Sequence, residues 1–350
     1  MTYFAPIRIA SLATAVPTHI LEREFVMAEA KRIFARFGDE FERMAGVFAN
    51  TGIDRRYSVC PVEWFETATS WGDRAARFLE GAKTLFRQAA GEALERANLG
   101  AKDIDVIVTV SSTGIATPSV EAHVMHEIGF RDDVMRVPVF GLGCAGGVTG
   151  LALAAQLASG ARPRKVLLVV IELCTLHFRP DEMSKSNIVA TALFGDGAAA
   201  MVISADGEGP VIECMGQHTW KDTINIMGWR VDDEGLGAIF ARSIPDLVLN
   251  DMRPAAAGFL ARNDMSLMDI GHFSFHPGGT KVLQALETVF EMQDGTLENE
   301  RKVLAGYGNM SAPTVLFVLQ EAFRHKAKGR RFVGSLGPGF TSSFLTLVHE

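Results

Sequence analysis

The run that decides the fold is Gly141-Leu-Gly-Cys144-Ala-Gly-Gly-Val-Thr-Gly-Leu-Ala-Leu-Ala-Ala155, which follows the apolar segment Val137-Pro-Val-Phe140. The pattern predicts a strand, a glycine turn and a helix, with Cys144 in the first helical turn under little side-chain cover. Backbone N–H groups and the positive end of the helix dipole would favour a thiolate there. The alternative interpretation is a buried cysteine in a Gly/Ala packing seam.

Three landmarks occur twice along the chain in nearly one register. Asp103 and the apolar run after it match Asp269 at an offset of 166 residues, and Gly143-Cys144 matches Gly308-Asn309 at an offset of 165. The run from Lys165 matches the run from Arg331, again at 166. Strands that alternate with helices indicate a parallel sheet covered on both faces. We therefore expect a duplicated α/β unit with halves 1–206 and 207–350, and a site between them.

A fourth matching pair breaks this register. Gly195-Asp-Gly197 matches Gly337-Pro-Gly339 at an offset of only 142, which implies an insertion of 24 residues in the first half, around Glu172 to Ile188. The inserted stretch is polar at Arg179-Pro-Asp-Glu and cannot be a core strand. Long insertions in compact folds are usually functional or interfacial.

Composition restricts the possible function classes. The 350 residues are 48% hydrophobic, which is ample for a sizeable core. The net charge of −7 argues against nucleic acid or an anionic membrane as the main partner, and no run is long enough for a membrane span. The four cysteines lack metal or disulfide spacing, and no signal peptide is visible. We expect a cytoplasmic protein with free thiols and no metal site; its cysteines are Cys60, Cys144, Cys174 and Cys214.

Two polar residues far downstream complement Cys144. His276 ends the apolar run His272-Phe-Ser-Phe275 just before Pro-Gly-Gly, and the carboxyl ends of strands are where open α/β sheets place reactive groups. Asn309 precedes a helix start. Cysteine supplies a nucleophile, and histidine and asparagine supply donors for a carbonyl oxygen that gains negative charge. Cysteine proteases use the same residue types, so composition alone does not select the reaction.

Five short motifs follow one another along the chain: Gly143-Cys144, Ala192-Leu-Phe194-Gly-Asp-Gly-Ala-Ala-Ala200, Phe275-His276-Pro-Gly-Gly279, Tyr307-Gly-Asn309-Met-Ser311 and Leu336-Gly-Pro-Gly-Phe340. Together, and over nearly the whole chain, they resemble type III polyketide synthases, the chalcone synthase-like enzymes of the thiolase fold. The resemblance implies a layered αβαβα arrangement, a homodimer, coenzyme A thioester substrates including malonyl-CoA, and no bound cofactor.

The resemblance also assigns roles to residues. Cys144 matches the family's acyl-carrying nucleophile, and His276 with Asn309 matches the pair that binds the malonyl carbonyl and supports decarboxylation. Phe194 matches the aromatic residue that steers the malonyl group. Arg55 and Arg56 resemble the basic stretch near the coenzyme A phosphates.

Related condensing enzymes differ from this chain at particular residues. Thiolases use a second late cysteine, and nothing after Cys214 is cysteine. Many ketoacyl synthases pair two histidines, whereas the second position here is Asn309. The nearest rival is a carrier-protein-dependent ketoacyl synthase III-like enzyme with histidine and asparagine. A catalytically idle thiolase-fold scaffold is the alternative outside the enzymes.

Departures from the plant pattern bear on the starter. A second entrance phenylalanine, counted back from Pro245, falls on Ala238, with Phe240 close by but off register. A cavity methionine, counted from Pro118, becomes Thr117. A threonine of the cavity floor falls on or near His177. Loss of a phenyl ring would open the cavity. We therefore expect a medium- or long-chain acyl-CoA starter, as in bacterial alkylpyrone and alkylresorcinol synthases, with a small starter as the alternative.

Overall fold

The computed structural model describes residues 5–66, 70–325 and 327–350. Within them, one mixed sheet runs in the order β11-β12-β13-β8-β1-β7-β6-β4-β5, and two antiparallel pairs, β2–β3 and β10–β9, stand apart from it. The strands of the large sheet are β1 (Arg8–Ala15), β4 (Val106–Ser111), β5 (Met135–Phe140), β6 (Val166–Leu173), β7 (Asp196–Ser204), β8 (Val211–Thr219), β11 (His272–Phe275), β12 (Gly329–Gly337) and β13 (Thr341–His349). The separate pairs are β2 (His19–Glu22), β3 (Arg55–Ser58), β9 (Met227–Asp232) and β10 (Gly235–Phe240).

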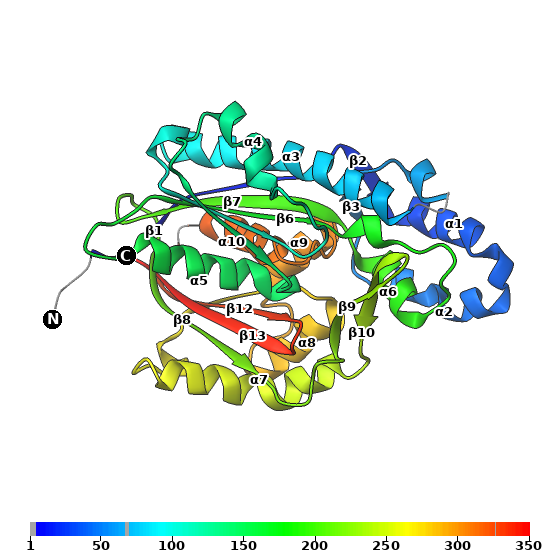
Figure 1. Cartoon of the computed structure of the whole chain (residues 1–350). Helices are drawn as coiled ribbons and strands as arrows, with labels where there is room; N and C mark the ends of the chain where they lie inside the picture. Colours follow the sequence, from blue (N-terminus) through cyan, green and yellow to red (C-terminus); the bar gives the residue numbers. More distant parts are fainter. Residues whose placement is uncertain (1–4, 67–69, 326) are drawn as a thin grey trace.

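The large sheet folds back on itself where β1 meets β8. Only short pairing joins them, with Ile212 N donating to Ile7 O at 2.8 Å. Helices α3 (Trp71–Arg96) and α4 (Val120–Ile128) cover one outer face, α7 (Ile244–Ala261) and α8 (Thr280–Val289) cover the other, and α5 (Gly146–Ala158) and α10 (Thr314–Phe323) lie between the two sheet layers (Figure 1). The expected αβαβα arrangement is confirmed. The remaining helices are α1 (Arg23–Ile33), α2 (Asp39–Ala49), α6 (Lys185–Leu193) and α9 (Glu298–Tyr307).

Strand composition explains why the layers form. Every residue of β4 and β6 is buried, and both strands consist largely of Val, Ile and Leu, as expected when both faces of a sheet are covered. Val108 and Val110 pack into the central cluster with α5, whereas Ile107 packs outward with α3. Apolar side chains alternate between two cores because successive strand residues point to opposite faces.

Matching elements occur in both halves of the chain. A short 3-10 turn precedes β4 at Ala101–Asp103, and another precedes β11 at Leu267–Asp269. Helix α5 follows Cys144 just as α10 follows Asn309. The extra length of the first half is also visible, because residues 174–195 join β6 to β7 whereas residues 338–340 join β12 to β13. Glu172, however, lies inside β6 and is fully buried, so the inserted chain begins two residues later than expected.

The central helices approach the opposite half at glycines. A Cβ built on Gly147 would lie 2.3 Å from the carbonyl oxygen of Ala312, and one on Gly337 would lie 2.6 Å from that of Leu142. No side chain fits at either place. Glycine thus lets the turn of Cys144 touch both the segment before α10 and the end of β12.

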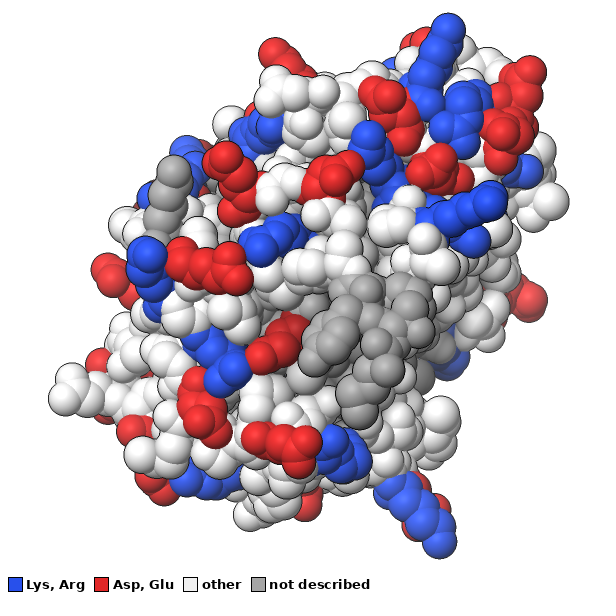
Figure 2. All heavy atoms as spheres, turned by 90° about the vertical axis from the view of Figure 1, so that its left-hand side faces the viewer, with Lys and Arg blue, Asp and Glu red and all other residues white. Residues whose placement is uncertain are grey.

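The surface carries charges of both signs. On the face shown in Figure 2, lysine and arginine residues alternate with acidic ones rather than forming one basic area. Among the described helices, none combines the length and the apolarity that crossing a bilayer requires.

Candidate active site

Cys144 lies in a 3-10 turn, Gly143–Ala145, that leads directly into α5. Gly143 has φ +48° and donates its N–H to Ser112 Oγ at 2.9 Å, which fixes the turn. Contrary to expectation, the thiol is covered: Cys144 is only 6% exposed, and burial raises its pKa to about 12. A hydrogen bond with the Ser311 side chain opposes that rise. Desolvation therefore favours the neutral thiol over the expected thiolate.

Asn309 is held on both its backbone and its side chain. Its N–H donates to Leu193 O at 2.9 Å, and its carbonyl accepts from Gly195 N at 3.1 Å. Its Oδ1 accepts from Ser311 N at 2.8 Å, and its Nδ2 donates to Gly278 O at 3.4 Å. The amide thus lies between Ser311, which touches Cys144, and the loop that follows His276.

His276 follows β11, and its N–H donates to Gly334 O at 2.9 Å. The side chain is 5% exposed, and within the described part of the chain neither ring nitrogen has a hydrogen-bond partner. Burial lowers the pKa of His276 to about 3, so the imidazole is neutral at pH 7. A neutral ring offers one N–H donor and one acceptor nitrogen.

The three residues are linked through short contacts. Cys144 bonds to Ser311, the Ser311 N–H bonds to Asn309, and the Asn309 amide bonds to Gly278, whose own N–H donates to the His276 carbonyl at 3.0 Å. This arrangement supplies a thiol nucleophile and neutral donors for a carbonyl oxygen, with His276 free to move a proton.

Phe194 lies at the end of α6, next to Asn309, and is 7% exposed. Its ring centroid is 5.7 Å from that of Trp229 and 5.6 Å from that of Phe240. Ala238 packs against the same small cluster as Phe240, two residues away on β10. The space beside Phe194 is thus occupied by the Phe240 ring, although Ala238 carries no phenyl group.

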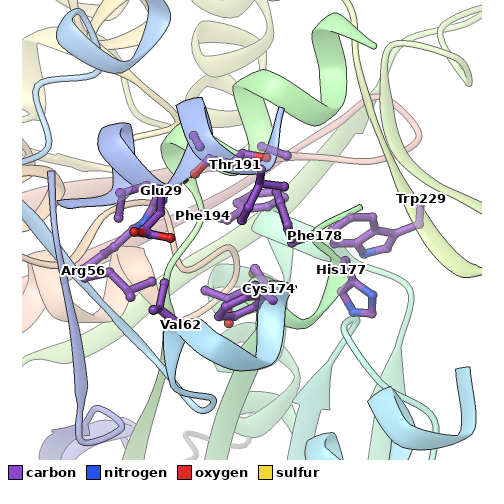
Figure 3. Close-up of a pocket in the computed structure, with 16 residues that line it drawn as sticks. Glu29, Arg56, Val62, Cys174, His177, Phe178, Thr191, Phe194 and Trp229 are labelled. Atoms are coloured by element: carbon purple, nitrogen blue, oxygen red, sulfur yellow. Dashed lines mark hydrogen bonds between the residues drawn. The ribbon is translucent and has the colours of Figure 1, made fainter. Parts of the chain in front are cut away.

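A pocket of about 620 Å³, partly open to solvent, lies between α1, α6 and the inserted chain (Figure 3). Its wall is mostly apolar. His177 closes one end, where its ring contacts Trp229 at 4.9 Å and its Nε2 lies 2.7 Å from Thr113 O. Burial lowers the pKa of His177 to about 4. The lining residues are Leu21, Val26, Glu29, Ala30, Ile33, Arg56, Val62, Phe65, Cys174, Thr175, His177, Phe178, Ala190, Thr191, Phe194 and Trp229.

Two of the expected binding residues, Thr117 and Arg56, lie outside the positions assigned to them. Thr117 is exposed on the loop between β4 and α4 and is no part of this pocket wall. Arg56 is 5% exposed, donates to Thr191 O and faces the pocket rather than the surface, so it is not placed for a coenzyme A phosphate in solvent. Side chains alternate along β3, which leaves Arg55 exposed.

Sequence reasoning missed the roles of three residues of the site. Ser311 stands in the Gly-Asn-Met-Ser motif already singled out, so its place beside Asn309 is a usable signal. Glu172 is buried below the cysteine turn, where its Oε2 accepts from Ser112 N at 2.9 Å, and burial raises its pKa to about 8. Trp229 carries no sequence signal, since its role depends on how the β9–β10 hairpin folds over Phe194.

Two family descriptions match consecutive parts of the chain. The N-terminal domain of chalcone and stilbene synthases matches residues 8–207, and the C-terminal domain matches residues 211–345. A putative chalcone synthase from Bacillus subtilis (strain 168) is 33% identical, with 98% of both chains covered. The chain belongs to the chalcone and stilbene synthase family. It is thus a type III polyketide synthase, an acyltransferase that condenses malonyl-CoA units.

Further relatives agree with this assignment. The 1,3,6,8-tetrahydroxynaphthalene synthase of Streptomyces peucetius subsp. caesius is 34% identical over 97% of this chain and 92% of its own. The solved enzyme of that name from Streptomyces coelicolor A3(2) superposes with a TM-score of 0.93 at 26% identity, covering 98% of this chain and 99% of its own. CsyB, solved with CoA-SH bound, shares the fold of this synthase at a TM-score of 0.90 and 23% identity, covering 98% of this chain and all of its own.

The contact between Ser311 and Cys144 makes a testable prediction. A hydrogen bond to a charged group contributes about 1.5–3 kcal/mol, and one pKa unit corresponds to about 1.4 kcal/mol. Ser311→Ala should therefore raise the pKa of Cys144 further and slow its alkylation by iodoacetamide roughly tenfold at pH 9. Peptide mass spectrometry measures the rate, with Cys214 as internal reference. An unchanged Cys144 rate would show that the hydroxyl does not stabilise the thiolate.

Proposed function

We propose that Cys144 carries the acyl group during condensation and that His276 and Asn309 bind the carbonyl of malonyl-CoA. The observation that supports this assignment is the chain of contacts from the thiol through Ser311 to the Asn309 amide and on to the His276 loop. The proposal uses an acyl-CoA starter, with malonyl-CoA as the extender. CsyB, solved with CoA-SH, is a member of the same fold.

The chemistry follows from the neutral state of the site. His276 takes the proton of the Cys144 thiol as the sulfur attacks the acyl thioester. It then gives this proton to the departing coenzyme A thiolate and is neutral again. Asn309 Nδ2 and a His276 N–H then donate to the malonyl carbonyl oxygen. Carbon dioxide departs, and its bonding electron pair forms an enolate that these donors stabilise. The enolate carbon attacks the Cys144 thioester, and the thiolate leaves as the new carbon–carbon bond forms.

Removing single groups should separate the two steps. Cys144→Ala should make no polyketide, yet should still release carbon dioxide from malonyl-CoA. Asn309→Ala should decarboxylate roughly 10²–10³-fold more slowly, because an oxyanion donor contributes about that much to the rate. Release of labelled carbon dioxide and product mass spectrometry measure both. Asn263→Ala, which removes a comparable bond to Phe259 O far from the site, is the control. Normal polyketide from Cys144→Ala would refute the assignment.

We propose further that the starter is a medium- or long-chain fatty acyl-CoA and that the product cyclises to an alkylpyrone or alkylresorcinol. The apolar pocket beside Phe194 supports this substrate class, since a buried methylene contributes about 0.8 kcal/mol. A small starter such as acetyl- or malonyl-CoA remains the second candidate, because Phe240 and Trp229 crowd Phe194.

Measuring kcat/KM for a series of saturated acyl-CoAs of increasing chain length decides between these starters. We expect kcat/KM to rise with length to about eight carbons or beyond, because each added methylene enters apolar surroundings. Mass spectrometry of the products also gives the number of malonyl extensions in each of them. Phe240→Ala should move the optimum to bulkier starters, while Ala238→Phe should depress turnover of all of them. A profile that peaks at two carbons and vanishes by about eight would exclude the long-chain starter.

We also propose a homodimer that forms along β5. This strand ends the large sheet, so its outer edge has no neighbouring strand among the described residues. It exposes two large apolar side chains, Met135 (46% exposed) and Phe140 (55%), and the loop between β4 and α4 exposes Ile115 (58%). Natural proteins rarely leave such an edge bare.

Sedimentation tests the dimer directly. The wild-type protein should sediment at twice the 37.9 kDa of one chain at micromolar concentration. Phe140→Glu should shift it toward the monomer, because a carboxylate cannot be buried unpaired at low cost. Met268→Glu is the control, because Met268 is exposed on the 3-10 turn before β11, at the other end of the sheet. It should leave the sedimenting mass unchanged. Monomeric wild-type protein would contradict the proposal.

A further inference from the structure

The β9–β10 hairpin forms one side of the site without belonging to the large sheet. Its contacts go instead to α6 and to the turn Cys174–His177, both within the inserted chain. Through Trp229 on β9 and Phe240 on β10 it places two rings against Phe194 (Figure 3 shows Trp229). The position of these rings therefore depends on what fastens the hairpin to the insertion.

Arg179 makes that connection. Its guanidinium binds both carboxylate oxygens of Asp232, with Nη2–Oδ1 at 2.7 Å and Nη1–Oδ2 at 2.9 Å. Its Nη1 also lies 3.3 Å from Glu182 Oε2 and 3.5 Å from Glu234 Oε2. A Cβ on Gly237 would lie 3.0 Å from the Arg179 Cζ, so a glycine on β10 leaves room for the guanidinium.

The surroundings make this contact stronger than an ordinary surface ion pair. The Arg179 side chain is only 5% exposed, and bidentate pairs between arginine and carboxylate combine charge with fixed geometry. The Arg179 hydrogen bond holds the pKa of Asp232 well below its usual range. Arg230, on β9 itself, adds contacts to Asp232 Oδ2 at 3.0 Å and to Glu182 Oε2 at 2.9 Å. Two arginines and three carboxylates thus join the hairpin to the insertion.

We propose that Arg179 is a positioning residue for acyl-chain selection: its bidentate pair with Asp232 fixes the hairpin, and the hairpin in turn fixes Trp229 and Phe240 against Phe194. Asp232 lies three residues from Trp229 on the same strand, so a shift at the ion pair reaches the ring directly. The pair touches neither Cys144 nor the described contacts of His276 and Asn309. The inference rests on the proposed acyl-CoA starter, and it predicts a change in selectivity rather than in decarboxylation.

The test compares Asp232→Asn with wild type in the full-length protein. Dissociation constants for acyl-CoAs of increasing length are measured by calorimetry in a Cys144→Ala background, where no turnover interferes. Loosening one apolar wall should change the ratio of affinities between short and long chains roughly tenfold. Malonyl-CoA decarboxylation should change much less. Arg179→Lys should give an intermediate profile, because an ammonium group cannot bind both oxygens in one plane.

Glu213→Gln is the matched control. It disrupts another bidentate pair, in which Arg330 Nε and Nη2 each lie 2.7 Å from a Glu213 oxygen, far from the hairpin. Its chain-length profile should equal that of wild type. An unchanged profile in Asp232→Asn, or an equal change in Glu213→Gln, would overturn the proposal.

Failure of this inference can be told apart from failure of the proposed function. If the wild type extends no acyl starter, the proposed function fails. The dissociation constants for acyl-CoAs of increasing length still show whether the ion pair affects chain-length selection. If the wild type extends acyl starters but Asp232→Asn shows the same dependence of acyl-CoA affinity on chain length, only the proposed role of Arg179 fails. Amide hydrogen exchange over residues 227–240 shows whether the hairpin has loosened. Faster exchange with an unchanged chain-length dependence of affinity would identify a purely structural ion pair.

Discussion

The close contact of backbone with backbone at Gly147 and Gly337 is the constraint on which the site depends. Each glycine packs so closely against a carbonyl oxygen of the opposite half that a Cβ atom built on it would clash with that oxygen. The contact at Gly147 brings the start of α5 against Ala312, and Ser311 is the residue before it. Because Ser311 binds both Cys144 and Asn309, the spacing of the central helices sets the spacing of the nucleophile and the donor.

Burial then determines the chemistry available there. Cys144 and His276 are both nearly inaccessible, and desolvation favours their neutral forms, raising the pKa of the thiol and lowering that of the imidazole. Neutral hydrogen-bond donors in such a water-excluded site can stabilise the enolate. The cost is a nucleophile that must lose its proton within the complex.

Local patterns in the sequence predict a large part of the molecule. The repeat and the positions of Cys144, His276 and Asn309 at strand and helix ends follow from periodicity and glycine spacing, whereas the αβαβα layers follow from the family resemblance. The errors have one physical origin, since each depends on how separate segments pack. A count back from Pro245 points to Ala238, whereas the ring that contacts Phe194 comes from Phe240. Arg56 belongs to a basic pair typical of a surface, but strand alternation turns it inward.

One measurement tests the central claim most directly. Protein incubated briefly with an acyl-CoA, quenched in acid and digested with trypsin should carry the acyl mass on peptide 137–164, in which Cys144 is the sole cysteine. The account predicts that this peptide alone is acylated and that hydroxylamine, which cleaves thioesters, removes the added mass. An adduct on the peptide of Cys174, or none on Cys144 while polyketide accumulates, would contradict it.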